Sequence, residues 1–277
     1  MSFTRSTLPL LSMLAIMTAP FGAAVSAELY YEKHGEGPPL VLLHGAFMDI
    51  ESNWATMRDD LAQNHTVVAV ELQGHGRTAD RAQPLSYEGM ADDVAALLEE
   101  LDIASASMMG YSMGANVALQ MAIRHSDQVS SLVLISPSAS DSGNAAGHKA
   151  MVEYLSADMF AGTPLVETYE ALSPAPDFPA LVDKVKALEL TAFDWMDDVE
   201  RITVPTLIIG GDADVVTLDH LAALYLALGG ATHGDLNGLS NTQLAILPAT
   251  THTGGLMNPD NLPIVKDMSL RFLADLD

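Results

Sequence analysis

A serine lies between two glycines in the stretch Gly110-Tyr111-Ser112-Met113-Gly114. The stretch fits the pattern G-x-S-x-G, in which the serine is a nucleophile on a sharp turn between a strand and a helix. This turn strains the backbone of the serine, and side chains two residues away would collide, which glycine avoids. The N-terminus of the following helix adds positive partial charge and free N–H groups beside the hydroxyl. Ser112 is therefore the candidate nucleophile.

A serine hydroxyl needs a base, and the base needs a carboxylate that orients it. The stretch IIGGDADVV offers Asp212 and Asp214, and the stretch LPATTHTGG offers His252. Each stretch follows an apolar run typical of a strand, and open α/β sheets place their ligand crevice at the carboxyl ends of such strands. The order serine, acid, histidine along the chain fits the same arrangement. We therefore predict a catalytic group of Ser112, His252 and one of the two aspartates.

The elements that must position these residues can be predicted from apolar periodicity. Strand-like runs alternate with helical patterns from residue 28 onward, which predicts an α/β protein with a mainly parallel sheet. Most of the strand candidates are nearly continuous apolar runs, as expected for strands buried on both faces. The candidate strands are 40–43, 66–70, 105–109, 132–135, 206–209 and 243–247. The candidate helices are 53–63, 87–101, 113–124, 219–228 and 261–276.

One segment interrupts this alternation. Between residues 135 and 206 there is no strand pattern, but helical stretches occur at 148–160 and 181–190. Because a crossover needs only about a dozen residues, we interpret the excess as a helical cap inserted into the sheet domain. The predicted domains are a core of residues 28–136 and 201–277 and a cap of residues 137–200. Aromatic side chains of the cap are expected mainly to pack together, and some to line a substrate pocket.

Composition excludes several classes of function. The formal net charge is -24, from 12 basic and 36 acidic residues, and such a surface repels nucleic-acid phosphates and anionic lipid headgroups. We expect neither nucleic-acid binding nor stable membrane association. The chain has no cysteine, which excludes disulfides and thiolate metal ligands. Its nine histidines include no H-E-x-x-H pattern, so no metal site is predicted.

A dinucleotide cofactor is also not expected. Residues 74–79, GHGRTA, match the form G-x-G-x-x-A. The phosphate site of that motif depends on a helix that opens directly after it. The next helical pattern here begins near residue 87.

Residues 1–27 differ from the rest of the chain. They contain Arg5, an apolar stretch and the small-residue ending Val25-Ser26-Ala27. This is the pattern of a secretory signal peptide with its cleavage site. We therefore expect a soluble protein that is periplasmic or secreted and begins near Glu28.

Taken together, the motifs resemble those of the α/β-hydrolase superfamily. The similar stretches are LLHGAF at 42–47 for the oxyanion loop, GYSMG at 110–114 for the nucleophile elbow, VPTLIIGGDAD at 204–214 for the acid strand and LPATTH at 247–252 for the histidine loop. The resemblance covers nearly all of the chain after residue 27. It implies the α/β-hydrolase fold, a mainly parallel sheet flanked by helices with an inserted helical cap. It also implies Asp214 as the acid, with Asp212 the weaker candidate.

The same resemblance implies further site residues. The oxyanion donors would be the backbone N–H groups of Ala46 and Met113, with Phe47 as the alternative to Ala46. Candidates for the substrate pocket are Phe47, Tyr111, Met159 and Trp195. The stretch ELQGHGRT at 71–78 departs from the family loop, because Glu71, Gln73 and Thr78 stand where the family usually has Asp, Arg and Ser. That loop shapes the pocket and performs no chemistry, so the catalytic interpretation stands.

The resemblance implies acyl transfer to water without a cofactor. We expect an exported serine hydrolase that cleaves carboxylic esters or lactones of small to medium apolar substrates through an acyl-enzyme on Ser112. Enzymes with the same triad leave two alternatives open, a carbon–carbon bond hydrolase and a perhydrolase or cofactor-free haloperoxidase. A ligand-binding or signalling protein with the hydrolase fold is the alternative that is not an enzyme.

Overall fold

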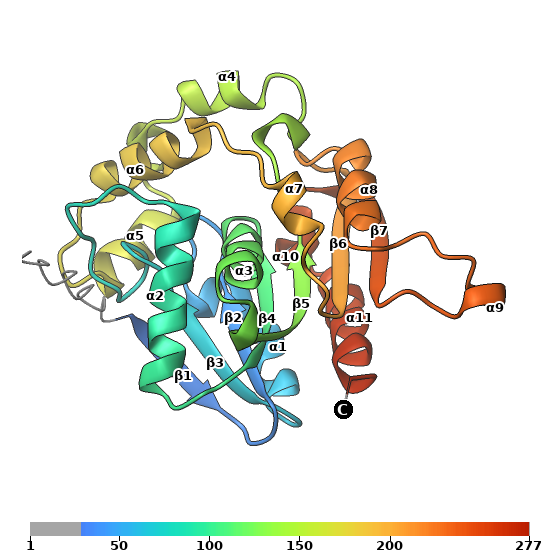
Figure 1. Ribbon diagram of the computed structural model, residues 1–277. Coiled ribbons are helices and arrows are strands. Elements are labelled where there is room, and N and C mark those ends of the chain that lie inside the picture. Colours follow the sequence, from blue (N-terminus) through green and yellow to red (C-terminus); the bar gives the residue numbers. More distant parts are fainter. Residues whose placement is uncertain (1–28, 277) are drawn as a thin grey trace, which may run out of the picture.

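A seven-stranded sheet forms the centre of the molecule (Figure 1). The computed structural model describes residues 29–276, so the predicted signal peptide lies outside the described residues. The strand order is β1-β3-β2-β4-β5-β6-β7. β1 runs antiparallel to β3, and all other neighbours are parallel. The strands are β1 Tyr30–His34, β2 Pro39–Leu43, β3 Thr66–Glu71, β4 Ala106–Tyr111, β5 Val129–Ile135, β6 Thr206–Ala213 and β7 Thr242–Thr251.

The burial of the strands explains which of them the sequence predicts. β2, β3, β4 and β5 are apolar runs buried almost throughout, the pattern of strands covered on both faces. β1 has the sequence YYEKH and alternates between half-buried and exposed residues at the edge of the sheet. It lacks an apolar run and was not among the predicted strands.

Helices cover both faces of the sheet. One core is formed with α2 Tyr87–Glu100, α3 Met113–Arg124 and α8 Leu218–Ala227, and the other with α1 Ile50–Leu61 and α11 Leu262–Ala274. On α1 the buried apolar residues are Ile50, Trp54, Met57 and Leu61, which the helical period places on one side. The short helix α10 Gly254–Met257 lies between β7 and α11. No helix within residues 29–276 is both long and apolar enough to span a membrane.

Four α-helices lie between β5 and β6, in the segment where the sequence predicts a cap. They are α4 His148–Glu153, α5 Pro164–Leu172, α6 Phe178–Leu190 and α7 Met196–Val199. In Figure 1, α4, α5 and α6 form an arch over the core. The predicted helix 148–160 stops at Glu153, and α5 was not predicted. Lys184 on α6 fastens this segment to the core, because its ammonium bonds to Asp80 Oδ1 and Oδ2 at 2.8 and 2.6 Å.

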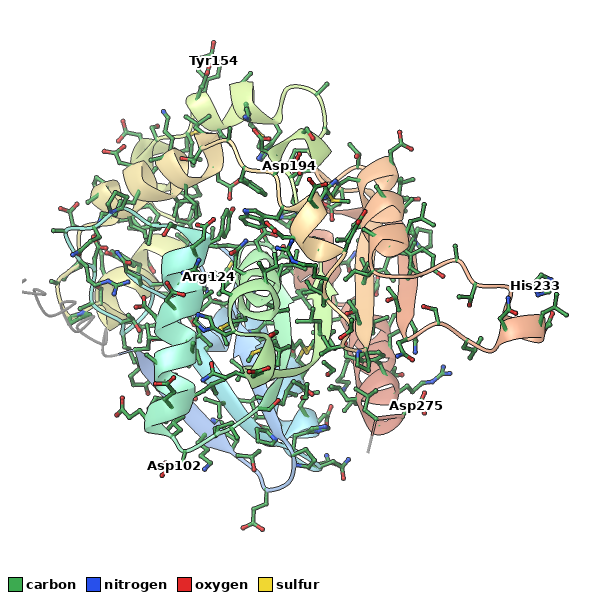
Figure 2. All side chains as sticks on the ribbon, viewed as in Figure 1. Asp102, Arg124, Tyr154, Asp194, His233 and Asp275 are labelled. Atoms are coloured by element: carbon green, nitrogen blue, oxygen red, sulfur yellow. The ribbon has the colours of Figure 1, made fainter. Side chains whose placement is uncertain are left out.

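The connection from α8 to β7 projects from the body of the molecule (Figure 1). It contains the four-residue helix α9 Gly234–Asn237, and Figure 2 shows His233 near its outer end. The sequence predicts a loop over 229–241, and α9 is the one short helix described within that range. The projection precedes the start of β7, whereas Asp214 and His252 follow the ends of β6 and β7.

Candidate active site

Ser112 is the single residue between the end of β4 and the start of α3. Its backbone has φ 53° and ψ -118°, in a region that non-glycine residues rarely adopt. A side chain at Gly110 would collide with the carbonyl of Gly114, and one at Gly114 would collide with the carbonyl oxygen of Leu43. The glycines around the serine are therefore required by the packing of α3 against β2 and β4.

A line of hydrogen bonds joins the three predicted catalytic residues. Ser112 Oγ lies 2.8 Å from His252 Nε2, and His252 Nδ1 lies 2.7 Å from Asp214 Oδ1. The carboxylate accepts, so Nδ1 carries the proton and Nε2 is free to accept the serine proton. The three side chains come from the carboxyl ends of β4, β6 and β7. This is the arrangement of a hydroxyl nucleophile with a base and an orienting acid.

The Asp214 side chain is fully shielded from solvent. Its carboxylate is therefore stabilised by hydrogen bonds from protein groups. Ser136 Oγ donates to Asp214 Oδ2 at 2.6 Å, and the Val216 N–H donates to Oδ1 at 3.1 Å. Burial raises the pKa of Asp214, but the hydrogen bonds from His252, Ser136 and Val216 outweigh burial and leave the pKa below its ordinary value. The acid is therefore held as a carboxylate.

Ser136 was not among the predicted site residues. It follows β5 directly, is 4% exposed and has φ 53°. Its N–H donates to Ile209 O at 2.7 Å, and the Ser112 N–H donates to Ile135 O at 2.9 Å. The nucleophile, Ser136 and the strand that carries the acid are thus joined by backbone bonds at the ends of β4, β5 and β6.

Asp212, the weaker candidate for the acid, has a different partner. Its Oδ1 accepts a hydrogen bond from the Thr250 N–H at 3.1 Å, two residues before the histidine. Asn261 Nδ2 donates to Thr250 Oγ1 at 3.0 Å. Asp212 therefore fixes the loop that carries His252, while Asp214 makes the contact with the imidazole.

Tyr111 supports the histidine from the other side. Its hydroxyl donates to the His252 carbonyl oxygen at 2.9 Å, and the two rings stack with centroids 5.7 Å apart. Burial raises the pKa of Tyr111, and the Asp214 carboxylate raises it further, so the phenol stays protonated and donates. Tyr111 was predicted to line the pocket, and the structure places it beneath the histidine loop.

The loop from His44 to Phe47 stands beside Ser112 and is held by buried polar groups. The Gly45 N–H donates to Asn53 Oδ1 at 2.8 Å, and the Leu72 N–H donates to His44 Nε2 at 3.0 Å. Within residues 29–276, no acceptor is bonded to the N–H of Ala46 or of Met113. Both predicted oxyanion donors are therefore available. Asn53, which positions this loop, carries no motif that could identify it from sequence.

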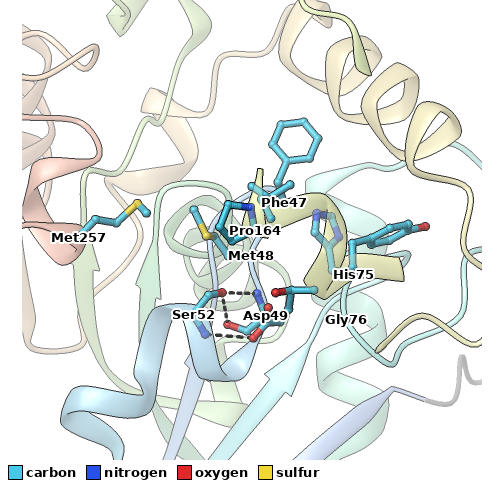
Figure 3. Close-up of a pocket in the computed structure, with 11 residues that line it drawn as sticks. Phe47, Met48, Asp49, Ser52, His75, Gly76, Pro164 and Met257 are labelled. Carbon is cyan, nitrogen blue, oxygen red and sulfur yellow. Dashed lines mark hydrogen bonds between the residues drawn. The ribbon is translucent and has the colours of Figure 1, made fainter. Parts of the chain in front are cut away.

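A cavity of about 220 Å³ lies next to this loop (Figure 3). It is lined by Phe47, Met48, Asp49, Ser52, His75, Gly76, Pro164, Leu165, Thr168, Tyr169 and Met257. Of the four predicted pocket residues, Phe47 lines it. Met159 is 62% exposed and lies outside the lining. Trp195 is buried and packs against Phe193 and Tyr87, with ring centroids 4.3 and 5.4 Å away.

Comparison with known proteins identifies the fold. A meta-cleavage product hydrolase from Pseudomonas fluorescens superimposes with a TM-score of 0.71 at 22% identity, over 91% of this chain and 97% of that one. A thermophilic esterase from Thermogutta terrifontis gives 0.67 at 22% identity, over 90% and 93%. Residues 38–168 match the family model described as the alpha/beta hydrolase fold. The model match and the solved structures agree that the chain has the α/β-hydrolase fold.

Sequence relatives of the chain have different names. A dihydrolipoyllysine-residue acetyltransferase component from Pseudomonas putida is 41% identical over 42% of this chain, and that match spans about a third of the relative, 32%. A putative carbamate hydrolase from Azorhizobium caulinodans is 24% identical over 93% of this chain and 99% of its own length. A pimeloyl-[acyl-carrier protein] methyl ester esterase from Nitrosospira multiformis is 28% identical over 84% and 94%.

Proposed function

We propose that the protein is an exported serine hydrolase that cleaves carboxylic esters or lactones of small to medium apolar substrates. The observation that carries the proposal is the hydrogen-bonded line from Asp214 through His252 to Ser112. Relatives of nearly full length with hydrolase and esterase names support the same reaction class. The apolar walls of the cavity beside Phe47 support a substrate of modest size and low polarity.

In the proposed reaction, His252 Nε2 takes the proton of Ser112 Oγ as the oxygen bonds to the carbonyl carbon of the substrate. The carbonyl oxygen becomes an oxyanion, which accepts hydrogen bonds from the backbone N–H groups of Ala46 and Met113. Collapse of this intermediate breaks the bond to the leaving oxygen, which receives the proton from His252. A water molecule then gives a proton to His252 and attacks the acyl carbon, and Ser112 regains its proton as the acid departs.

Asp214 contributes without giving up its charge. It accepts from His252 Nδ1, which fixes the tautomer that leaves Nε2 facing the serine, and it stabilises the imidazolium that forms. Each backbone donor at the oxyanion is worth about 3 to 4 kcal/mol in the transition state. No step needs a cofactor.

A fluorophosphonate probe followed by peptide mass spectrometry tests the nucleophile and the base together. We expect a label on Ser112 in the wild type, almost none in His252→Ala and full labelling in His233→Ala, which replaces the exposed histidine near α9. The same proteins are assayed with short acyl nitrophenyl esters and lactones. A label on a residue other than Ser112 would reject the proposed nucleophile. A single acylation without release would reject the proposed turnover and favour a binding protein.

The proposal of export rests on residues 1–27. N-terminal sequencing of the protein recovered from the periplasm or the culture medium should begin near Glu28. Recovery of the uncleaved chain from the cytoplasm alone would remove export from the proposal and leave the chemistry untouched.

A further inference from the structure

The cavity lies between the loop after β2, helix α5 of the predicted cap and helix α10. Phe47 follows Ala46, one of the two predicted oxyanion donors, and Met257 lies on α10, directly after the histidine loop. On the side of the cap, α5 contributes Pro164 and Tyr169. Figure 3 shows Met257 on one side of the pocket and His75 on the other, with Phe47 between them. The cavity is thus lined by residues close in sequence to Ala46 and His252, although neither Ser112 nor His252 lines it.

The size of the cavity limits what it can hold. Its 220 Å³ correspond to about seven water molecules at roughly 30 Å³ each. Most of the wall is apolar, from Phe47, Met48, Leu165, Tyr169 and neighbouring side chains. Such a space suits one short arm of a substrate, and an apolar wall disfavours a charge on that arm.

The charges at the cavity have one sign. Among its eleven described lining residues, none is Lys or Arg, and Asp49 is the one acidic side chain. Asp49 is 6% exposed, and its Oδ1 accepts from the Ser52 N–H at 3.0 Å. His75 adds no positive charge, because burial, with a smaller effect of His44, lowers its pKa to about 3. An anionic group in this cavity would meet a carboxylate and no cation.

We infer that this cavity binds an uncharged arm of the substrate and that Asp49 excludes substrates whose arm ends in a carboxylate. That the arm belongs to a hydrolysed ester or lactone rests on the proposed function. The discrimination by charge does not depend on it, because it follows from the lining residues alone. Asp49 is thus a specificity residue, and it does not contact the reacting atoms.

Binding measured without turnover tests the discrimination. Pentanamide and pentanoate have nearly the same shape and differ in charge. In the Ser112→Ala variant, titration followed by NMR should show pentanamide binding tighter by roughly tenfold or more, because two like charges within a few ångströms repel even when partly screened. The resonances that move should include those of Phe47 and Met257.

The variant Asp49→Asn removes the charge and keeps the shape. Asp49 is the N-cap residue of α1. Asn caps a helix as well as Asp does, so α1 should keep its N-terminus and the melting temperature should stay near that of the parent. The ratio of the two affinities should then fall toward one. Glu51→Gln is the matched control, because it removes an equal charge from the exposed Glu51, which does not line the cavity, and it should leave the ratio unchanged.

The same comparison can be made in turnover with the nitrophenyl esters of adipic acid and of its monoamide. The wild type should prefer the monoamide ester, and Asp49→Asn should reduce that preference. Equal binding of pentanamide and pentanoate, or an unchanged ratio in Asp49→Asn, would overturn the inference. Loss of all esterase activity would count against the proposed function alone, since the binding ratio would still be measurable.

Discussion

Ser136 donates a hydrogen bond of 2.6 Å to Asp214 Oδ2 while its own backbone is held at φ 53°. A serine in this left-handed region is strained by about 1 to 2 kcal/mol, and such strain is found where the surrounding structure holds a functional group in place. The Ser136 hydroxyl donates to Oδ2 of Asp214, whereas His252 bonds to the other carboxylate oxygen, Oδ1. Ser136 is therefore a positioning residue for the acid.

Removal of this hydroxyl should reduce catalysis more than stability. In Ser136→Ala the buried Asp214 loses a donor, and we expect kcat/KM to fall about tenfold, because hydrogen bonds to charged groups are the stronger class. The carboxylate becomes more basic and holds the imidazole proton more firmly. The acid limb of the pH profile of kcat/KM should therefore move to higher pH.

The variant Ser136→Gly separates this effect from packing. It lacks the hydroxyl but relieves the left-handed strain, so its free energy of unfolding should exceed that of Ser136→Ala by about 1 kcal/mol. Its activity and pH profile should match those of Ser136→Ala. If activity followed stability across the two variants, a role in positioning would be ruled out.

The two aspartates after β6 should respond differently to the same substitution. Asp214→Asn replaces the acceptor of the His252 Nδ1 proton and favours the wrong tautomer, so kcat should fall by about 10⁴. Asp212→Asn keeps an acceptor for the Thr250 N–H and should cost less than about tenfold. Steady-state kinetics on one nitrophenyl ester gives both values, and a reversed order would assign the acid to Asp212.

Gly114 should tolerate no side chain. A methyl group there would meet the Leu43 carbonyl oxygen, so Gly114→Ala should lower the free energy of unfolding by about 3 kcal/mol. Gly255→Ala is the control, because its added methyl group would lie 3.8 Å from Ile135 Cγ2, an ordinary contact. Urea unfolding monitored by circular dichroism measures both, and equal losses would contradict the steric explanation.

Stability should fall in mildly acidic solution because of two buried histidines. Burial lowers the pKa of His44 to about 4 and that of His75 to about 3, whereas an unfolded histidine titrates near 6.5. Below pH 6.5 the unfolded chain binds protons that the folded chain does not, so stability decreases as pH falls toward 4. At pH 5 the loss is about 2 kcal/mol for each histidine.

Urea unfolding at pH 7 and pH 5 measures this loss. His75→Gln should be less stable at pH 7 and should show a smaller change between the two pH values, because one of the two titrating groups is gone. A free energy of unfolding that is the same at both pH values would show that neither histidine is held neutral by the fold.

The parts of the site with local signals could be predicted from sequence. The glycines around Ser112 and the apolar runs before Asp214 and His252 each reflect a constraint within a few residues, and the structure brings the three side chains into one hydrogen-bonded line. The parallel sheet was predicted for the same reason, since strands buried on both faces have continuous apolar sequences.

The parts that depend on tertiary contacts could not be predicted. Ser136 and Asn53 are ordinary residues in sequence, and their roles come from hydrogen bonds to Asp214, 78 residues away, and to Gly45, eight residues away. Tyr111 is predicted as a pocket residue, but its hydroxyl reaches the histidine loop. β1 was missed because an edge strand with one exposed side lacks an apolar run.

Backbone hydrogen bonds join Ser112 to Ile135 and Ser136 to Ile209. They anchor the candidate nucleophile and the residue that positions Asp214 to adjacent strand ends. The helices α4, α5 and α6 are inserted between β5 and β6 and do not interrupt those bonds. Selectivity and reactivity are therefore separable by engineering: a graft that exchanges the arch of helices should change which compounds are accepted and leave the bond-breaking apparatus intact.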